Sequence, residues 1–468
     1  MMIDVISGGL VTPMVWLSYF SPNMPLLATA TEAEGPMVLA GVLLSLVVVY
    51  LASKVGGELS NRLGFPPVLG ELVAGVIVGM SVLKLLVFPD GEADGSVSVI
   101  MQILQGTAGL SPAAVTPTFN SIGEVVSVLS ELGVIILLFE IGLESNLKQL
   151  LEVGIQATIV AVVGVVTPFA AGTAGLMLWF HVPAIPAIFA GAALTATSIG
   201  ITSKVLSEIG RLNTKEGQII IGAAVIDDVL GIIVLAVVAS LAKTGEVDVA
   251  NVIYLIISST VFLVGAILLG NFFNKFFTSI VNSLKTRGNI IIPALIFAFI
   301  LAYVGAAIHL EAILGSFAAG LIFEENDECK ELEKQIIPIA DIFVPIFFVS
   351  VGAKTNLGVL NPAIPSNREG LIIAIFLIVV AILGKVVTGL AVFGQDRINR
   401  LAIGVGMIPR GEVGLVFAGI GTASGVLSDA LNAAIIMMVI LTTFLAPPLL
   451  RIVFQEPSAS SLQPSGDS

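Results

Sequence analysis

Thirteen apolar stretches, most of them near the length of a membrane-crossing helix, constrain this chain more than any other feature. About 20 consecutive apolar residues carry a helix across the hydrocarbon core of a bilayer. A soluble chain of 468 residues would ordinarily form roughly two or three domains. Here 56% of the residues are hydrophobic, only 11% are charged and the mean hydropathy is +1.07, which excludes that class. We therefore expect an all-α polytopic membrane protein.

The apolar stretches predict about thirteen transmembrane helices joined by short loops. Their cores cover residues 36–54, 65–88, 120–143, 153–181, 186–209, 216–241, 250–275, 288–308, 311–323, 340–356, 370–393, 398–424 and 429–453. The ninth and tenth stretches are short, so we expect these helices to tilt or to extend beyond the apolar residues. The longest loop is 89–119, and its segment 98–110 is expected to form a small surface helix.

The two ends of the chain differ from the part between them. Residues 1–35 contain three prolines and no Lys or Arg, which makes a poor signal peptide, and we interpret them as an extension on the outer face. Residues 455–468 are polar and are expected to be disordered. We expect residues 36–454 to form the membrane domain, with no soluble domain attached.

The distribution of basic residues predicts how the chain is oriented. Of the 20 Lys and Arg residues, 14 lie in loops after odd-numbered helices or at the C-terminus, and four lie on the opposite face. Lys and Arg are enriched in cytoplasmic loops. We therefore expect the N-terminus outside or in the lumen and the C-terminus in the cytoplasm. The chain leaves open whether the membrane is the plasma (inner) membrane or a thylakoid.

Several classes of ligand are excluded by what the chain lacks. The basic residues are few and scattered and form no basic patch, so we expect no nucleic-acid partner. One cysteine, Cys329, allows neither an internal disulfide nor a cysteine metal cluster, and only two histidines are present. We expect no cofactor.

Two short motifs recur in the same order and indicate an internal repeat. Residues 69–77 (LGELVAGVI) match 314–322 (LGSFAAGLI), and 142–147 (GLESNL) matches 352–357 (GAKTNL). Each pair lies seven helices apart, so the two copies cross the membrane in opposite directions. We predict inverted six-helix repeats at 36–241 and 288–454, with 250–275 as a linker helix. Inverted repeats are typical of secondary transporters.

Two adjacent carboxylates lie in the middle of the sixth helix. Asp227 and Asp228 are the only charges in the run Gln218–Leu241. A carboxylate at that depth costs at least ~2.5–3.5 kcal/mol, so intramembrane acids usually mark an ion or proton site. We interpret the pair as a binding site for a monovalent cation or a proton.

The fifth and twelfth helices, which the repeat pairs, both carry interruptions at mid-membrane. Thr197 and Ser198 lie in the fifth helix where apolar residues are expected, and we assign them to the cation site. The twelfth helix contains Pro409-Arg410-Gly-Glu412, which favours unwinding. Two crossing broken helices leave four half-helix ends with partial charges. Arg410 and Glu412 are expected to compensate these charges, or else to act as structural caps.

A lone lysine in the eleventh helix, Lys385, is expected to pair with a carboxylate at that depth, or else to extend its ammonium to the nearer membrane surface. The partner is expected to be one of the two aspartates. Adjacent residues on a helix point about 100° apart, so one aspartate can face Lys385 while the other faces an aqueous cavity. Spacing alone does not decide which. Glu140 and Glu71 are further intramembrane acids and serve either as accessory acids or as hydrogen-bonded structural groups.

A site that holds either a proton or a cation and opens alternately to each face gives obligatory exchange. A cation channel, an intramembrane aspartyl protease and an ion-coupled solute symporter are the alternatives. A protease requires its two aspartates to face each other from different helices, and Asp227 and Asp228 are neighbours on one helix. We expect a transporter rather than an enzyme.

Taken together, the motifs identify a resemblance to the monovalent cation:proton antiporter family, in its Asp-Asp branch. The matching stretches are LGFPPVLGELVAGVIVG, ELGVIILLFEIGLE, the Thr-Ala-Thr-Ser break, GAAVIDDVLGI, PIFFVSVG and GMIPRGEVGLVF. The resemblance implies Na⁺/H⁺ antiport, with K⁺ or Li⁺ as alternative ions. It also implies a core of helices at 153–241 and 370–453, and a dimerisation domain made of the remaining helices in a homodimer.

The resemblance further divides the roles of the charged residues. Asp228 matches the carboxylate that binds cation or proton in the family, and Asp227 matches the aspartate that pairs with the lysine, here Lys385. A lysine beside an Asp pair implies electrogenic exchange. The long 89–119 loop and the N-terminal extension depart from the minimal family pattern.

Overall fold

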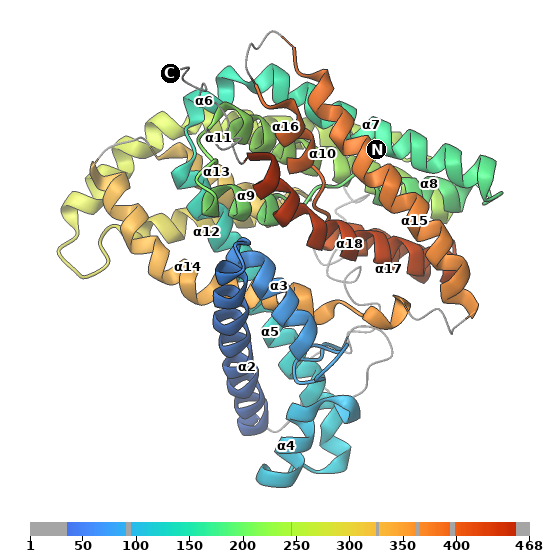
Figure 1. The fold of residues 1–468 in the computed structure, drawn as a ribbon. Helices are drawn as coiled ribbons and strands as arrows, with labels where there is room; N and C mark the ends of the chain where they lie inside the picture. Colours follow the sequence, from blue (N-terminus) through green and yellow to red (C-terminus); the bar gives the residue numbers. More distant parts are fainter. Residues whose placement is uncertain are drawn as a thin grey trace, which may run out of the picture.

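The structure, a computed structural model, describes residues 35–89, 95–244, 246–323, 327–360, 365–393 and 398–454. Within these ranges the chain forms 17 α-helices and four 3-10 segments, and no strand (Figure 1). The predicted all-α class is therefore confirmed. The predicted outer extension at 1–34, residues 90–94 of the long loop, and the predicted disordered tail lie outside the described residues.

The first half of the chain contains nine helices. They are α2 (Gly35–Arg62), α3 (Pro67–Val78), α4 (Val99–Ala108), α5 (Val115–Glu144), α6 (Leu147–Glu152), α7 (Gly154–Trp179), α8 (Ala184–Ala193), α9 (Ile199–Glu208) and α10 (Lys215–Thr244). The remainder are α11 (Val249–Ser283), α12 (Ile291–Ala307), α13 (Ala312–Ile322), α14 (Asp327–Lys354), α15 (Pro365–Val386), α16 (Arg400–Gly406), α17 (Glu412–Ala423) and α18 (Asp429–Phe454).

Each of the thirteen predicted stretches contains a helix or a pair of half-helices. Eight of the described helices are long and apolar enough to cross a membrane, and several others are short apolar helices. The tenth helix extends beyond its apolar stretch, as expected: α14 has 28 residues, because its first turns are charged and lie outside the apolar run. The ninth does not extend, since α13 has 11 residues. The number of crossings stays a prediction.

Close glycine contacts join helices of the two predicted repeats in a reciprocal pattern. A Cβ on Gly75 of α3 would lie 2.9 Å from Cα of Gly352 in α14. Correspondingly, a Cβ on Gly320 of α13 would lie 2.7 Å from Cα of Gly142 in α5. Gly75 and Gly320 occupy the same position in the first motif, and Gly142 and Gly352 occupy the same position in the second. The first motif of each repeat therefore packs on the second motif of the other repeat. Such small-residue contacts let helix backbones approach closely in a membrane.

The helices pack in two groups. One group contains α2, α3, α5, α12, α13 and α14, and the other contains α7, α8, α10, α15, α17 and α18. Figure 1 shows α2, α3 and α5 as a column below α14, with the second group above it. The half-helix α9 contacts members of both groups, including α5 and α10.

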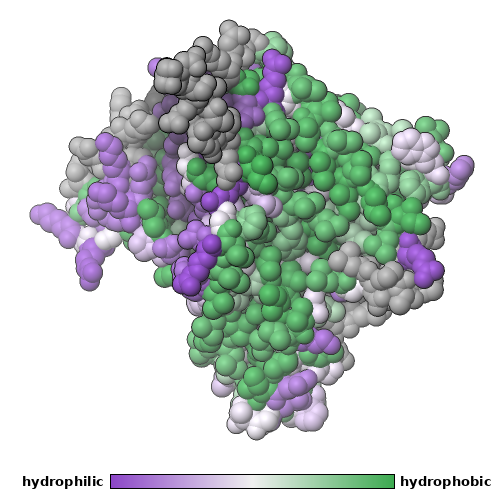
Figure 2. Space-filling model, viewed as in Figure 1, coloured by the Kyte–Doolittle hydropathy of each residue, from purple (hydrophilic) through white to green (hydrophobic). Residues whose placement is uncertain are grey.

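A regular apolar face on α2 shows how the surface suits lipid. Leu39, Leu43, Val47, Leu51 and Val55 follow a four-residue spacing and are all more than half exposed. Residues four apart lie on one side of a helix. Figure 2 shows hydrophobic residues covering this column and much of the face above it, with hydrophilic residues toward the edges. The chain therefore presents lipid-compatible surface where a soluble protein would present polar residues.

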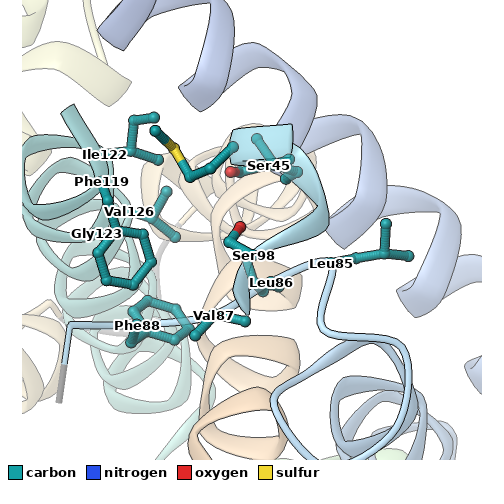
Figure 3. A pocket seen from close by; sticks show the side chains of 12 residues that line it. Ser45, Leu85, Leu86, Val87, Phe88, Ser98, Phe119, Ile122, Gly123 and Val126 are labelled. Atoms are coloured by element: carbon teal, nitrogen blue, oxygen red, sulfur yellow. The ribbon is translucent and has the colours of Figure 1, made fainter. Parts of the chain in front are cut away.

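The segment before α5 closes one end of the column. The predicted surface helix is present as α4, and it buries Ile100, Met101 and Leu104 against its neighbours. A cavity of about 10 Å³ lies between α2, α4, α5 and residues 85–88 (Figure 3). That volume accommodates at most about one water molecule, so this cavity is a packing defect and not a ligand site.

Candidate ion site

The fifth predicted helix is interrupted where the sequence places its hydroxyl residues. The half-helix α8 ends at Ala193 and α9 begins at Ile199, so residues 194–198 are not helical. Thr197 and Ser198 lie in this break and are buried. Non-helical backbone at this depth is tolerated only where it is buried in protein or lines a cavity.

The twelfth predicted helix is interrupted at the Pro-Arg-Gly-Glu motif. The half-helix α16 ends at Gly406, and α17 begins at Glu412. Pro409 supplies no N–H and cannot continue the hydrogen-bond pattern of α16. The side chain of Glu412 lies outside the described part of the structure, so its predicted charge-compensating role stays a prediction.

Hydrogen bonds hold the two breaks against each other. The Ser198 backbone N–H donates to the carbonyl of Pro409 at 2.8 Å. Thr197 Oγ1 donates to the Met407 carbonyl at 3.2 Å. A Cβ on Gly411 would lie 2.8 Å from Ser198 Oγ, so only glycine fits this contact without a shift. The two interrupted helices therefore cross at their breaks.

Arg410 is fully buried at the crossing and donates to carbonyls at the ends of both N-terminal half-helices. Its Nη2 lies 2.6 Å from the carbonyl of Leu194, the C-cap of α8. Its Nη1 lies 3.2 Å from the carbonyl of Met407, the C-cap of α16, and 3.3 Å from that of Ile408. The C-terminal end of a helix carries about half a negative charge. One guanidinium thus neutralises two such ends. Thr443 of α18 donates in turn to the Arg410 carbonyl.

Asp227 and Lys385 form a buried ion pair between α10 and α15. Lys385 Nζ lies 3.2 Å from Asp227 Oδ2 and 3.4 Å from Oδ1, and neither side chain is exposed. Gly164 of α7 leaves room for the ammonium, since a Cβ there would lie 3.2 Å from Nζ. Asp228 is also buried, and α10 packs against all four half-helices of the crossing.

The buried centre contains as many acidic as basic side chains. Asp227 and Asp228 are the acids, Lys385 and Arg410 are the bases, and all four are buried. Lys385 acts electrostatically on both aspartates and on Arg410. Buried ions require partners because removal from water costs several kcal/mol each. A monovalent cation entering this centre adds one charge that a departing proton can compensate.

The two predicted accessory acids lie in α3 and α5, which contact α9, within an acidic group that sequence reasoning missed. Glu71 accepts a hydrogen bond from Ser53 at 2.6 Å. Glu140 is buried, and its Oε2 accepts no hydrogen bond from any described residue. Lys204 of α9 acts electrostatically on Glu71, Glu140 and Glu208. Only the packing of α9 on α3 and α5 reveals this group, because Lys204 looks like an ordinary basic residue at a helix end.

Two crossed broken helices beside buried carboxylates and an intramembrane lysine define a secondary transporter of cations. The whole chain supports this class, because residues 39–456 match the family model described as "Sodium/hydrogen exchanger, transmembrane". The chain belongs to the sodium/hydrogen exchanger family.

Individual relatives agree with this assignment. The chain is 65% identical over 437 residues to the high-affinity Na⁺/H⁺ antiporter NhaS3 of Synechocystis, covering 93% of this chain and 95% of that protein. It is 33% identical to the Na⁺/H⁺-K⁺ antiporter GerN of Bacillus cereus, covering 87% and 95%. The fold is similar to that of the sodium proton antiporter MjNhaP1 of Methanocaldococcus jannaschii, with a TM-score of 0.57, 17% identity, and coverage of 88% and 95%.

Proposed function

We propose that this protein exchanges Na⁺ for H⁺ across a membrane by alternating access. The observation that carries the proposal is the buried centre in which Asp227, Asp228, Lys385 and Arg410 lie at or beside two crossing helix breaks. Family membership and 65% identity to a high-affinity Na⁺/H⁺ antiporter support both the reaction and the ion.

Asp228 is the group that binds either Na⁺ or a proton. Asp227 is occupied by Lys385, which leaves the neighbouring carboxylate about 100° further around α10 as the exchanged ligand. Na⁺ prefers hard oxygen ligands. Thr197 and Ser198 supply hydroxyl and freed carbonyl oxygens, and a hydroxyl that donates to a carbonyl, as Thr197 does, still keeps lone pairs for a cation.

Lys385 couples the charge of the cation to proton release. With no cation bound, Asp228 carries a proton and Asp227 pairs with Lys385. A bound Na⁺ takes the place of the Asp228 proton and weakens the Asp227–Lys385 pair. Proton loss from Lys385 in addition to Asp228 makes exchange electrogenic, as the family resemblance implies. Because Na⁺ and H⁺ compete for one carboxylate, lowering the pH raises the Na⁺ concentration needed for half-maximal exchange.

Glu140 and Glu71 are accessory acids on the route to this centre. Both lie in the helix group that contains α3 and α5, close to Lys204 of α9. When ionised, they attract cations toward the site and repel anions. The lack of a hydrogen-bond donor to Glu140 Oε2 among the described residues suits a group that meets a passing ion.

The two helix groups move against each other during the cycle. The mobile core at 153–241 and 370–453 is the group that contains α7, α8, α10, α15, α17 and α18, together with the half-helices α9 and α16. The remaining helices form a dimerisation domain in a homodimer. The N-terminus lies outside or in the lumen of the plasma (inner) or thylakoid membrane, and the C-terminus lies in the cytoplasm.

K⁺/H⁺ exchange by the same site is the second candidate, because the name of the GerN relative includes K⁺. Proteoliposomes with an acidic interior and a trapped pH dye separate the two. We expect NaCl to discharge the pH gradient at much lower concentration than KCl, with LiCl tested alongside and choline chloride inert. An equal or stronger response to KCl would reverse the ion assignment. Single-channel current without proton movement would replace antiport by a channel.

A further inference from the structure

An apolar groove is lined by residues from the end of α11, the start of α12 and the loop between them. Its volume is about 450 Å³, within the range of about 300–1,000 Å³ common for small-molecule sites. Residues that line it include Phe277, Arg287, Ile292, Ile296, Phe297 and Ile300. Of the described lining residues, none is acidic, so the groove does not suit a cation.

One wall of the groove is a hydrocarbon-like strip along α12. Ile292, Ile296 and Ile300 lie one above another at four-residue spacing and are 53%, 53% and 52% exposed. At 1.5 Å per residue the strip extends about 12 Å, which is most of one leaflet of about 15 Å. The groove therefore matches an acyl chain in length and chemistry.

The end of the groove toward the connecting loop is basic. Arg287 lines the cavity, is exposed, and forms no hydrogen bond or ion pair with a described residue. Lys285 lies two residues earlier and is also exposed. Basic pockets between transmembrane helices attract anionic lipid headgroups. Arginine in particular binds phosphate oxygens through its planar fork of donors.

We propose that this groove binds a membrane phospholipid with an anionic headgroup, whose phosphate pairs with Arg287 and whose acyl chain lies along Ile292, Ile296 and Ile300. The charge at one end and the apolar strip behind it select an amphiphile over a soluble anion. This proposal requires only that the helices lie in a bilayer and is independent of which cation the protein carries.

The test compares lipids that differ in headgroup charge. Purified, delipidated protein is mixed with dioleoyl phosphatidylglycerol or with dioleoyl phosphatidylcholine, and its thermal unfolding and its lipid-bound mass by native mass spectrometry are measured. We expect phosphatidylglycerol to raise the Tm and to add a retained lipid mass, whereas phosphatidylcholine does so weakly or not at all. Equal effects of both lipids would overturn the proposal.

Variants locate the effect. Arg287→Gln is expected to fold normally, because no hydrogen bond or ion pair of the side chain with a described residue is lost, and to lose the phosphatidylglycerol-specific shift. Ile296→Trp fills the groove and is expected to lose the bound lipid mass. Arg400→Gln, at another exposed arginine outside the groove, is the matched control and should keep both.

Two results would contradict the assignment. Retention of the headgroup-specific shift in Arg287→Gln would place the lipid elsewhere. If Ile296→Trp instead converts an oligomer to a monomer in every lipid and still retains the lipid mass, the groove is a contact with a second copy of the chain. Light scattering of the same samples distinguishes these results from lipid loss.

Discussion

The two buried cations at the centre of this protein have different partners. Lys385 faces a side-chain carboxylate, whereas the hydrogen bonds of Arg410 go to backbone carbonyls of Leu194, Met407 and Ile408. A point charge suits the first task, since an ammonium can exchange its partner or lose its proton. A planar fork of donors suits the second, since it satisfies several fixed acceptors at once. Arginine and lysine are therefore not interchangeable here.

Replacing Arg410 is predicted to lower the stability of the fold, because its side chain holds the two crossing helix breaks together. Arg410→Gln leaves carbonyls at two helix ends without their donor, and each unsatisfied buried group costs about 1–3 kcal/mol. Arg410→Lys keeps the charge but not the fork, so we expect an intermediate loss. Thermal unfolding of the purified variants measures this. Arg400→Gln, at an exposed position, serves as control, and wild-type Tm in Arg410→Gln would contradict the interpretation.

The Asp227–Lys385 pair is predicted to be energetically coupled. Removing one partner of a buried ion pair typically costs about 3–5 kcal/mol, because the other charge remains buried. We expect Asp227→Asn and Lys385→Gln each to lower the Tm, and the double variant to be less destabilised than the sum of the two. Additive losses in this double-mutant cycle would show that the two side chains do not depend on each other.

Residue chemistry predicted the location of this centre but not all of its partners. Hydroxyl residues, Pro409 and buried charges stand out in apolar runs, so both helix breaks and the need of Lys385 for an aspartate were visible in the sequence. The acceptor of Arg410 at Leu194 lies 216 residues away, and no local pattern indicates it. The group around Lys204 was missed for the same reason, since it forms only when α9 packs on α3 and α5.

At the scale of elements, glycine decides which helices meet most closely. Gly75 of α3 faces α14, and Gly320 of α13 faces α5, with backbone atoms less than 3 Å from where a Cβ would stand. The sequence motifs that suggested a repeat are therefore also packing contacts. The exact ends of helices were less predictable: that α14 would extend was expected, but where it begins was not, because hydropathy does not detect charged helical turns.

Alanine at these contacts is predicted to disrupt packing. In Gly75→Ala the new Cβ would lie 2.3 Å from the Val349 carbonyl oxygen, and in Gly320→Ala it would lie 2.4 Å from that of Phe139. Overpacking of this kind typically costs about 1–3 kcal/mol. Gly419→Ala in α17 has open space and is the control, expected to match or exceed wild type because alanine favours helix. Tm and monodisperse yield are the measurements. Equal behaviour of all three would argue against the close contacts.

The whole molecule combines a lipid-compatible exterior with a charged centre. Apolar faces such as that of α2 are exposed, while Asp227, Asp228, Lys385 and Arg410 are buried. The all-helical class followed from composition because hydrophobic residues fill nearly every helix. The path by which ions reach the centre could not be predicted from composition, because it depends on the relative position of two helix groups.

Orientation in the membrane is predicted from the basic residues and can be tested with two exposed arginines. Arg287 is expected to face the cytoplasm and Arg368 the opposite side. In a Cys329→Ala background, Arg368→Cys should react with a membrane-impermeant maleimide in intact cells or in vesicles of the same orientation. Arg287→Cys should react only after permeabilisation. The reverse labelling pattern would invert the topology.

The most direct test of the central claim is exchange by Asp228→Asn in proteoliposomes, measured as Na⁺-dependent discharge of a pH gradient. Asparagine keeps the size of the side chain but holds neither a proton nor the charge that binds Na⁺. We expect no discharge above that of empty liposomes, while Asp429→Asn, at an exposed position at the start of α18, exchanges like wild type. Na⁺-dependent discharge retained by Asp228→Asn would show that another group carries the exchanged ions.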